Sequence, residues 1–579
     1  MYRAPLVSFA RLGVAVSVGV LSACGGDSGG GGATPLAADL PPFCQTVLAD
    51  VEAHQRTIAN QRAEGPQYGG TAVVGLVSDL VDGMNVFSAA DYGDEQHANH
   101  VNLMTLVRYD ADLSPLPYLA ESWELSEDGR SLTFNLRQDV LWHDGTPTTA
   151  QDVAFTFETI MDPVTQYPNA SLWAAYESIE VVDDHTVRLT MEPHVGYMDV
   201  WRATSIMPNH LLGDVPRAEL DGHPYGTRCP VGNGPFVFQD NIIGERWTFV
   251  ANPEFPEGLG GQAKLDRYVL RPITDQNTLF AELLAGGIDI YPSPLIQQTE
   301  RIESDPSLQL RSFPFRNYVL VAWNSRQPEL ADKRVRQAIA HATNRPQVVQ
   351  VLRQGYATLA NATVPPFHAD YDAAVEERMP YNPGLAESLL TEAGWIDRDG
   401  DGIRENTDGL PLEIGIRYNT GNEERQNIAE IMQAELIQVG IRVIVESVEW
   451  GTIVEAITSE ERSFDGVVLS WVAPFVVNDA ALFQSDRINE PFAFSGTRSD
   501  ELDDLMRRIH QTTDASLLAP LLAEYEDAVI DEQPYTFLFY PDRIVGLNRR
   551  IQGVEMDVRG EWINLREWWI PEAERKYGA

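Results

Sequence analysis

The chain has 579 residues, of which 42 are Lys or Arg and 85 are Asp or Glu, giving a formal net charge of −43 at pH 7. Such an acidic surface repels phosphates, which excludes nucleic acid as a partner. With 44% hydrophobic residues the chain can bury large cores, and its length allows roughly two to four domains.

The first 23 residues are typical of a secretory signal peptide. Arg3 and Arg11 supply positive charge, and the apolar run that follows is too short to span a bilayer. The ending 21-LSAC-24 resembles a bacterial lipobox, which implies that Cys24 becomes the lipidated first residue of the mature chain. The alternative is an ordinary signal peptide with a chance cysteine. Residues 24–65 are then expected to form a flexible, Gly/Ser-rich tether and an N-terminal arm.

Apart from Cys24, the chain has two cysteines, Cys44 and Cys229. Outside the cytosol such a pair is more often bridged than free, so we predict a disulfide that holds the N-terminal arm to the body. Two free thiols are the alternative. Beyond the signal peptide, no apolar run approaches the ~20 residues that a membrane-spanning helix needs.

Periodicity in the first half of the body predicts a strand, three hairpins and a helix. The helix should begin at Thr149, which is placed to cap it together with Asp152 three residues later. The strand is expected at 70–77, and the hairpins are expected at 123–136 (turning at 128–129), 179–191 and 235–250.

The second half is richer in helices, although strands recur. Apolar spacing predicts a helix over 428–439, ended by Gly440 and followed by a strand at 441–448. Asn382 and Pro383 are suited to open another helix. Helices and strands alternate without a fixed repeat, which indicates an α/β or α+β multidomain protein.

The segment 395-WIDRDGDGIRENTDG-409 begins like a calcium-binding EF-hand loop. Asp397, Asp399 and Asp401 alternate and Gly402 follows, but position twelve is Asp408, where the motif has a glutamate. A helix is expected before the loop and a strand, 411–419, after it, so we predict a helix-to-strand connection. Whether the four aspartates bind one structural calcium ion or form a solvated acidic turn stays open.

The order of several segments is similar to that of a known family. They are 119-LAESWELSEDGRSLTFNLRQDVLWHDGTPTTAQDVAFTFE-158, 232-GNGPF-236, 252-NPEF-255, 283-LLAGGIDI-290, 332-DKRVRQAIAHATNR-345, 381-YNPGLAESLLTEAGW-395 and 464-FDGVVLSW-471. Across roughly residues 66 to 570 the chain resembles extracellular solute-binding protein family 5, the oligopeptide, dipeptide and nickel receptors of ABC importers.

The resemblance implies an α/β fold of the periplasmic-binding-protein type, with two hinged α/β lobes and an extra α+β lobe. The first ligand lobe would take 66–108, 178–290 and 531–579, the extra lobe 109–177, and the second ligand lobe 291–530. It also implies a monomer without enzymatic activity or a required cofactor. Such a receptor encloses a peptide or similar solute by hinge closure and delivers it to an ABC permease. It would work, lipid-anchored, on the periplasmic or extracellular face of a bacterial membrane.

Peptide-binding members of this family carry a Trp-x-Ala-Asp motif whose aspartate pairs with the ammonium of the peptide. Here Trp471 and Ala473 match, but Pro474 stands at the position of the aspartate. Trp471 is the leading candidate for a ligand contact, with a core tryptophan as the alternative. Asp479 could replace the missing acid only if the loop bends differently. An oligosaccharide, an N-blocked peptide or another solute therefore competes with a free peptide, and a sensory protein that presents ligand without transport is a third reading.

The resemblance suggests further ligand contacts at Phe87, Ser88, Phe539 and Tyr540, each of which is equally suited to packing. Arg336 is interpreted as structural. His97 and His100 have the i, i+3 spacing of metal ligands, but a solvated helix face is the stronger interpretation. Sequence motifs of metalloproteases, serine hydrolases and phosphate-binding loops are absent, which argues against an enzyme.

Overall fold

The computed structural model describes residues 40–88, 91–368, 371, 374–512 and 517–576. It divides into Met1–Pro41, which is described only at residues 40 and 41, and Pro42–Ala579, which contains every element discussed below. The predicted signal peptide, Cys24 and the tether as far as residue 39 lie outside the described residues.

The N-terminal arm is helical. Helix α1 runs over Pro42–Ile58 and is followed by a 3-10 turn at Ala59–Gln61, so the predicted N-terminal arm consists of a helix and a turn from Pro42 to Gln61. Cys44 in α1 forms a disulfide with Cys229, which follows α6 (Pro224–Arg228) directly. The predicted bridge is confirmed, and an ion pair between His54 and Glu254 (2.8 Å) adds a second attachment of α1 to the body.

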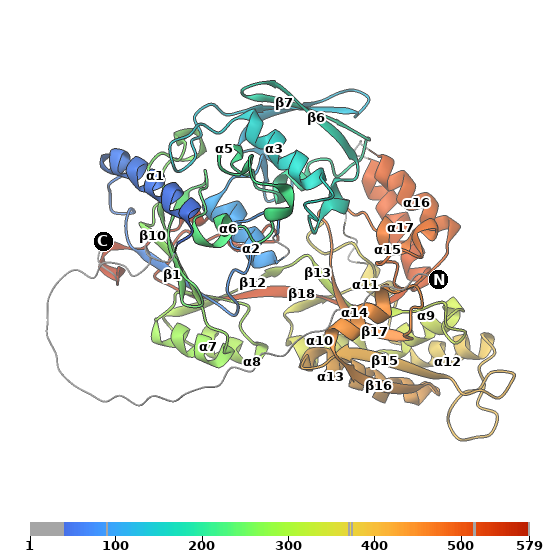
Figure 1. Ribbon diagram of the computed structural model, residues 1–579. Helices are drawn as coiled ribbons and strands as arrows, with labels where there is room; N and C mark the ends of the chain where they lie inside the picture. The colour runs from blue at the N-terminus through green and yellow to red at the C-terminus, as the bar shows by residue number, and fades with distance from the viewer. Residues whose placement is uncertain (1–39, 89–90, 369–370, 372–373, 513–516, 577–579) are drawn as a thin grey trace, which may run out of the picture. The chain divides into compact units, whose positions relative to one another are not determined.

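One long strand, β18 (Tyr535–Asn548), belongs to two groups of strands, as Figure 1 shows in red. Its second half pairs with β11 (Ile290–Pro292) and β12 (Leu308–Pro314), and its first half pairs with β13 (Asn317–Trp323) and β14 (Ala357–Leu359). We call the strands on the β11 side the first sheet and those on the β13 side the second sheet. The chain crosses between them at residues 315–316 and again within β18.

The first sheet is built around β1 (Thr71–Leu76), which lies parallel to β10 (Arg267–Pro272) and β11. Strands β9 (Arg246–Ala251) and β8 (Phe236–Ile242) extend it as an antiparallel hairpin, as predicted. Helices α7 (Gln276–Ala285) and α8 (Ile296–Glu303) cover one face. Their core contains Val73, Leu279, Leu283, Ile288, Tyr291, Ile302 and Leu308.

Residues 291–314 therefore belong with the first sheet, and the predicted start of the second ligand lobe at residue 291 is wrong. Tyr291, Ile302 and Leu308 are buried in the same core as Val73, and β12 pairs with the half of β18 that also pairs with β11.

In the second sheet, β17 (Gly466–Val472) lies between β13 and β15 (Glu413–Asn419), and β16 (Arg442–Val448) lies at the edge. Side chains alternate between its two faces, so Val319 and Val321 enter one core while Leu320 and Ala322 enter the other. The first core is closed by α9 (Lys333–Ala342), α12 (Pro383–Glu392) and α13 (Glu423–Leu436). The second is closed by α14 (Trp450–Thr458), α16 (Asp500–Gln511) and α17 (Leu518–Glu532).

A separate antiparallel sheet has the order β4 (Ala120–Leu125), β5 (Ser131–Leu136), β7 (Thr186–Met191) and β6 (Tyr176–Asp183). Helix α3 (Ala150–Met161) packs beside it and begins with the predicted capping box of Thr149 and Asp152. Because β6 and β7 pair with this sheet, the predicted end of the extra lobe at residue 177 is wrong, since it divides β6.

Short elements connect these layers: α2 (Tyr92–His97), a π-helical turn (Ala98–Asn102), β2 (Val107–Tyr109), β3 (Pro115–Pro117), α4 (Asp199–Ala203), α5 (Asn209–Leu212), α10 (Arg345–Arg353), α11 (Val375–Arg378) and α15 (Ala480–Phe483). No helix found among the described residues combines the length and apolarity needed to cross a membrane.

Candidate ligand cleft

The carboxyl ends of parallel strands from both sheets face one cleft. Beyond the ends of β10 and β11 lie Gln276 and Ser293–Gln297, and beyond the end of β15 lies the loop 420–422 that leads into α13. All of these residues line a cavity of about 1340 Å³. In open α/β sheets, ligands bind outside the carboxyl ends of the strands, so this cavity is the candidate ligand site.

The crossing segments lie in the same cavity wall. Phe315 and Asn317 from the first crossing, and Pro541 and Asp542 from the second, all line the cavity. Its volume exceeds the ~300–1,000 Å³ of a typical small-molecule pocket. Because residues from both sheets line it, any change in the angle between the sheets changes the shape of the site.

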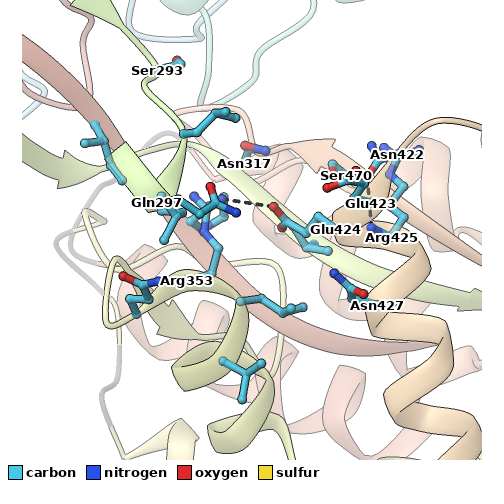
Figure 2. Close-up of a pocket in the computed structure, with 18 of the residues that line it drawn as sticks. Ser293, Gln297, Asn317, Arg353, Asn422, Glu423, Glu424, Arg425, Asn427 and Ser470 are labelled. Carbon is cyan, nitrogen blue, oxygen red and sulfur yellow. Dashed lines mark hydrogen bonds and ion pairs between the residues drawn. The ribbon is translucent and has the colours of Figure 1, made fainter. Parts of the chain in front are cut away.

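Polar side chains from α8, β13, α10, α13 and β17 line the cavity (Figure 2). Arg353 at the end of α10 pairs with Glu424 in the first turn of α13 (3.1 Å), and it also donates to the backbone oxygen of Asp542. Arg425 donates to Asn419 Oδ1 (2.9 Å), and burial lowers its pKa. Asn317 has a buried side-chain oxygen that no described residue contacts with a hydrogen bond.

The edge of β17 is unpaired where it enters the cavity. Strand β15 pairs with β17 only at Gly466 and Val467. The Ala473 N–H donates to Arg316 O on the β13 side (2.8 Å). Because backbone groups alternate along a strand, those of Ser470 and Val472 point to the other side, where β15 has diverged. Ser470 is exposed and lines the cavity, so its backbone donor and acceptor are available there.

Trp471 points to the opposite face from Ser470. Its half-buried ring packs against Phe492 (5.4 Å between centroids) and Phe494 (5.7 Å), beside the core closed by α14, α16 and α17. It does not line the cavity described above. Its role as a ligand contact stays a prediction, and its present contacts favour the packing alternative.

Asp479 does not stand in for the acid missing at Pro474. It is buried, and its Oδ2 accepts hydrogen bonds from the Thr363 and Tyr525 hydroxyls. Burial raises the pKa of this carboxyl. The carboxylate is thus held inside the second core, and the loop does not bend in the way that ligand contact would require.

The remaining predicted ligand residues are mostly buried. Phe87 packs edge-to-face on Phe155 (5.8 Å), and Ser88 is half-buried with its backbone N–H donating to Asn85 O. Phe539 lies in the core beside α13, and the Tyr540 hydroxyl donates to the carbonyls of Ala362 and Val364. These contacts favour a packing role for the four residues. Of the four, only Phe539 approaches the cavity, because the guanidinium carbon of Arg353, which lines the cavity, lies 5.9 Å from the centre of the Phe539 ring.

His97 and His100 are not on a solvated helix face, so that expectation is wrong. His97 is buried, with its ring nitrogens 2.7 Å from Gly93 O and 3.0 Å from Tyr268 Oη, and burial lowers its pKa to about 4. Arg336 is structural, as predicted. Its guanidinium donates to the carbonyls of Leu330, Ala331, Glu532 and Gln533.

The acidic loop gathers a slightly different set of carboxylates from the one predicted. Asp397, Asp399, Asp401 and Glu405 place one oxygen each within 4.8 Å of one another. Asp408 is not in this group, because it lies in the following turn, where its N–H donates to Asn406 Oδ1. The loop joins α12 to β15, which confirms the predicted helix-to-strand connection. Calcium binding stays a prediction, with Glu405 in place of Asp408.

Residues 114–487, more than half of the chain, match the family model of the bacterial extracellular solute-binding proteins, family 5 Middle. The chain belongs to this family. The oligopeptide-binding protein AppA of Bacillus subtilis is 28% identical over 517 residues, covering 88% of this chain and 94% of AppA. The heme-binding protein A of Haemophilus influenzae is 29% identical over 362 residues, covering 58% of this chain and 62% of that protein.

Solved structures agree with this assignment. B. subtilis AppA in complex with a nonapeptide has a TM-score of 0.73 at 28% identity, covering 87% of this chain and all of AppA. NikA of Brucella suis in complex with Fe(III)-EDTA, at 23% identity, shares the fold with a TM-score of 0.73, covering 86% of this chain and 99% of NikA. The two-lobed α/β fold of family 5 is therefore confirmed.

Sequence reasoning missed the side chains that line the cavity, above all Gln297, Asn317, Arg353, Glu424 and Ser470. They come from different elements of both sheets. The one signal available was that Glu424 follows closely after the strand predicted at 411–419.

Proposed function

We propose that this family 5 protein captures peptides or peptide-like solutes in the cleft between its two sheets and delivers them to an ABC permease. Closure of the lobes around the solute would shift the open–closed population toward the form that the permease recognises. Lipidation of Cys24 would hold the protein beside the membrane, as a monomer. The free edge of β17 at Ser470 and Val472 carries the proposal, because an extended peptide can pair with it as an added strand.

The charges in the cavity support a ligand with a backbone rather than a single compact group. Arg353 and Glu424 already pair with each other, so neither of these two charges stands free for a single compact ligand. Ser470, Asn317 and Asn427 supply uncharged donors and acceptors along the wall. The relative AppA of B. subtilis was solved in complex with a nonapeptide, which is consistent with a ligand that has a peptide backbone.

The first test is mass spectrometry of any solute that the purified protein retains, followed by thermal shifts with peptide and oligosaccharide libraries. A solute at 100 times its Kd adds about 2.7 kcal/mol to the free energy of unfolding. We expect retained peptides and shifts with peptides. Shifts with oligosaccharides alone would contradict the proposal and favour the non-peptide alternative, for which Pro474 is the specific argument.

The second test is a matched pair of variants at Ser470. Ser470→Pro removes the N–H that faces the cavity and leaves the β13 pairing intact, whereas Ser470→Ala keeps the N–H. We expect peptide affinity to fall about tenfold in S470P and to stay near wild type in S470A. Equal affinity in both variants would show that the peptide does not pair with β17.

A further inference from the structure

The segment that runs from the end of β7 through α4 contacts the second core, away from the strands that cross between the two sheets. Val195 packs against this core. The N–H of Val476 donates to the carboxylate of Asp199 in α4 (3.3 Å), and the rings of Tyr109 and Phe475 lie 5.9 Å apart at 72°. Because Phe475 and Val476 follow β17, these contacts join the two sides of the cleft.

The same segment is attached to the first sheet. The Asn99 side chain donates to the backbone oxygen of Ala203 at the end of α4 (2.8 Å). The Asn102 side chain, in the same π-helical turn as Asn99, donates to the backbone oxygen of Phe236 in β8 (3.2 Å). The segment therefore moves with the first sheet. When the angle between the sheets widens, its contacts with the second core must separate.

Two histidines, one from each side of the cleft, stack on each other in this interface. His194 follows β7 and His510 lies in the last turn of α16; their ring centroids are 5.8 Å apart and their planes meet at 14°. His194 is only 8% exposed, and its Nε2 atom has no hydrogen-bond partner within the described parts of the chain. A proton on this ring would bring a charge into a buried place without an acceptor for the Nε2–H. Protons on both rings would also place like charges face to face.

The groups that face the pair favour neutral rings. The Tyr176 ring of β6 meets His194 edge-on (5.9 Å), and the carboxylate of Asp199 in α4 is engaged by hydrogen bonds from its neighbours. Burial and the His510 charge lower the pKa of His194 to about 4, and burial and the Arg487 charge lower the pKa of His510. Ion pairs engage neighbouring charged side chains: Glu192 with Arg130, Arg487 with Glu490, Arg507 with Asp504, and Arg508 with Asp504 and Glu524.

We propose that His194 and His510 form an acid-sensitive latch across the cleft: neutral rings hold the extra lobe against α16, and protonated rings release it, so that the cleft opens in acid. When the contact separates, His194 meets water and binds a proton more readily, so acid favours the open form. An exposed histidine has a pKa of about 6.5. The contact is therefore complete above about pH 6.5 and is lost as the pH falls toward 4. The latch goes beyond the proposed function and rests on it only for one consequence, the release of a captured solute in acid.

Small-angle X-ray scattering of the protein without solute, at pH 7 and pH 5, tests the latch directly. We expect a larger radius of gyration at pH 5 in the wild type, although acid lowers the net negative charge and with it the self-repulsion that expands the molecule. His194→Gln and His510→Gln should each reduce this increase and the double variant should remove it, whereas His185→Gln, in the turn between β6 and β7, should keep it. Circular dichroism at both pH values checks that each protein stays folded. An unchanged radius in the wild type, or a full increase in the double variant, would overturn the proposal.

Calorimetry with trialanine then tests the consequence for a solute. The amino and carboxyl groups of trialanine stay charged at pH 7 and pH 5, so a change in affinity reports on the protein. We expect binding about tenfold weaker at pH 5 than at pH 7 in the wild type, because the closed form is less populated, and nearly equal binding in the double variant. Equal affinity at both pH values in the wild type would overturn the latch. Absence of trialanine binding at either pH would contradict the peptide function alone, because the scattering experiment judges the latch without a solute.

Discussion

Asp479 is held by two hydroxyl groups in the interior of the second core. Thr363 and Tyr525 both donate to its Oδ2 atom, the Tyr525 bond at 2.7 Å, and the rings of Tyr318, Tyr535 and Tyr540 lie in the same core. Burial raises its pKa, so the surroundings favour the protonated acid more than water does. The residue therefore acts on stability, and the structure gives it no route to the ligand cavity.

We expect Asp479→Ala to lower the free energy of unfolding by about 2–4 kcal/mol, because it leaves two buried hydroxyls without an acceptor. Urea unfolding followed by fluorescence measures this. Asn478→Ala, at the exposed neighbour, is the control and should change little. An Asp479 variant that keeps its free energy of unfolding but loses peptide affinity would show instead that this residue contacts the ligand.

Residue-level predictions are hardest where the direction of a side chain decides its role. Trp471 and Ser470 are adjacent, and the sequence favours the tryptophan because an indole offers the larger contact. The strand points Ser470 into the cavity and Trp471 onto Phe492 and Phe494. The sequence alone does not reveal which of the two residues faces the cavity, because both faces of β17 are partly covered.

At the scale of elements, the loop 397–405 is the clearest candidate for an ion. It brings Asp397, Asp399, Asp401 and Glu405 together, and Gly402 takes a positive φ of 90° that suits glycine in the turn. We expect calcium to raise the unfolding temperature and to bind with a Kd between about 10⁻⁶ and 10⁻³ M. Calorimetric titration of the protein, first treated with a chelator, measures this.

Two variants distinguish the two possible fourth ligands. Glu405→Gln should weaken calcium binding, whereas Asp408→Asn should leave it unchanged, because Asp408 lies outside the group. The reverse result would restore Asp408 as the fourth ligand, as the sequence suggested. Absence of heat at millimolar calcium in the wild type would leave only a solvated acidic turn.

His194 and His510 form a stacked pair between the segment after β7 and the end of α16. Their ring centroids are 5.8 Å apart with planes at 14°, and Tyr176 meets His194 edge-on. Burial and the His510 charge lower the pKa of His194 to about 4, while burial and Arg487 lower that of His510. Both rings are thus favoured in their neutral form in the folded protein.

This pair predicts a loss of stability in acid. The unfolded His194 has a pKa of about 6.5, so between about pH 6.5 and 4 the unfolded state binds more protons and the free energy of unfolding falls as pH falls. For His194 the loss is on the order of 3 kcal/mol across that window, and it is complete below pH 4. Unfolding measured at several pH values should show a shallower dependence in His194→Gln than in the wild type.

His97 and His143 also have pKa values lowered to about 4, so the wild-type slope contains their contributions, and the difference between variants is the informative quantity. His185→Gln, in the turn between β6 and β7, is the control. Identical pH dependence in wild type and His194→Gln would contradict the assignment.

Elements themselves were predictable because their signals are local. The capping box of Thr149 and Asp152 opens α3, Asn382 caps α12, and Gly440 closes the α13 segment with a positive φ of 85°. The lobe boundaries were not predictable in the same way. Strand β6 begins at Tyr176 and pairs with β7, and β7 pairs with β5, which ends far back in the chain at Leu136. Only this pairing across a long stretch of sequence assigns β6 to the extra lobe.

At the scale of the whole molecule, two sheets share β18, and one disulfide holds the N-terminal helix to the body. Because the cleft lies between the sheets, its shape depends on their relative angle, while each sheet keeps its own core. The family fold was recognisable from sequence because its segments occur in order. The cavity was not, because it is assembled from loops of both sheets that are far apart in the chain.

The net charge of −43 acts on the whole molecule through self-repulsion. Only Lys264, Lys333 and Lys576 accompany the arginines, so most carboxylates repel one another across the surface. The Debye length falls from ~30 Å at 0.01 M salt to ~10 Å at 0.1 M and ~3 Å at 1 M. Salt therefore screens the net repulsion over long distances first, and it weakens the short surface ion pairs, each worth about 0–1 kcal/mol, only later.

We expect the unfolding temperature to rise by on the order of 2–5 °C between 0.01 and 0.5 M sodium chloride, with most of the rise below 0.2 M. Differential scanning calorimetry at constant pH measures the change, and sucrose at matched osmolality is the control for effects that do not depend on charge. These measurements use the Asp399→Asn variant, which removes one carboxylate from the loop 397–405, so that ion binding there does not contribute to the change in unfolding temperature. A temperature that stays constant or falls with salt would mean that local ion pairs, such as Arg336 with Glu532 and Arg550 with Asp289, outweigh the net repulsion.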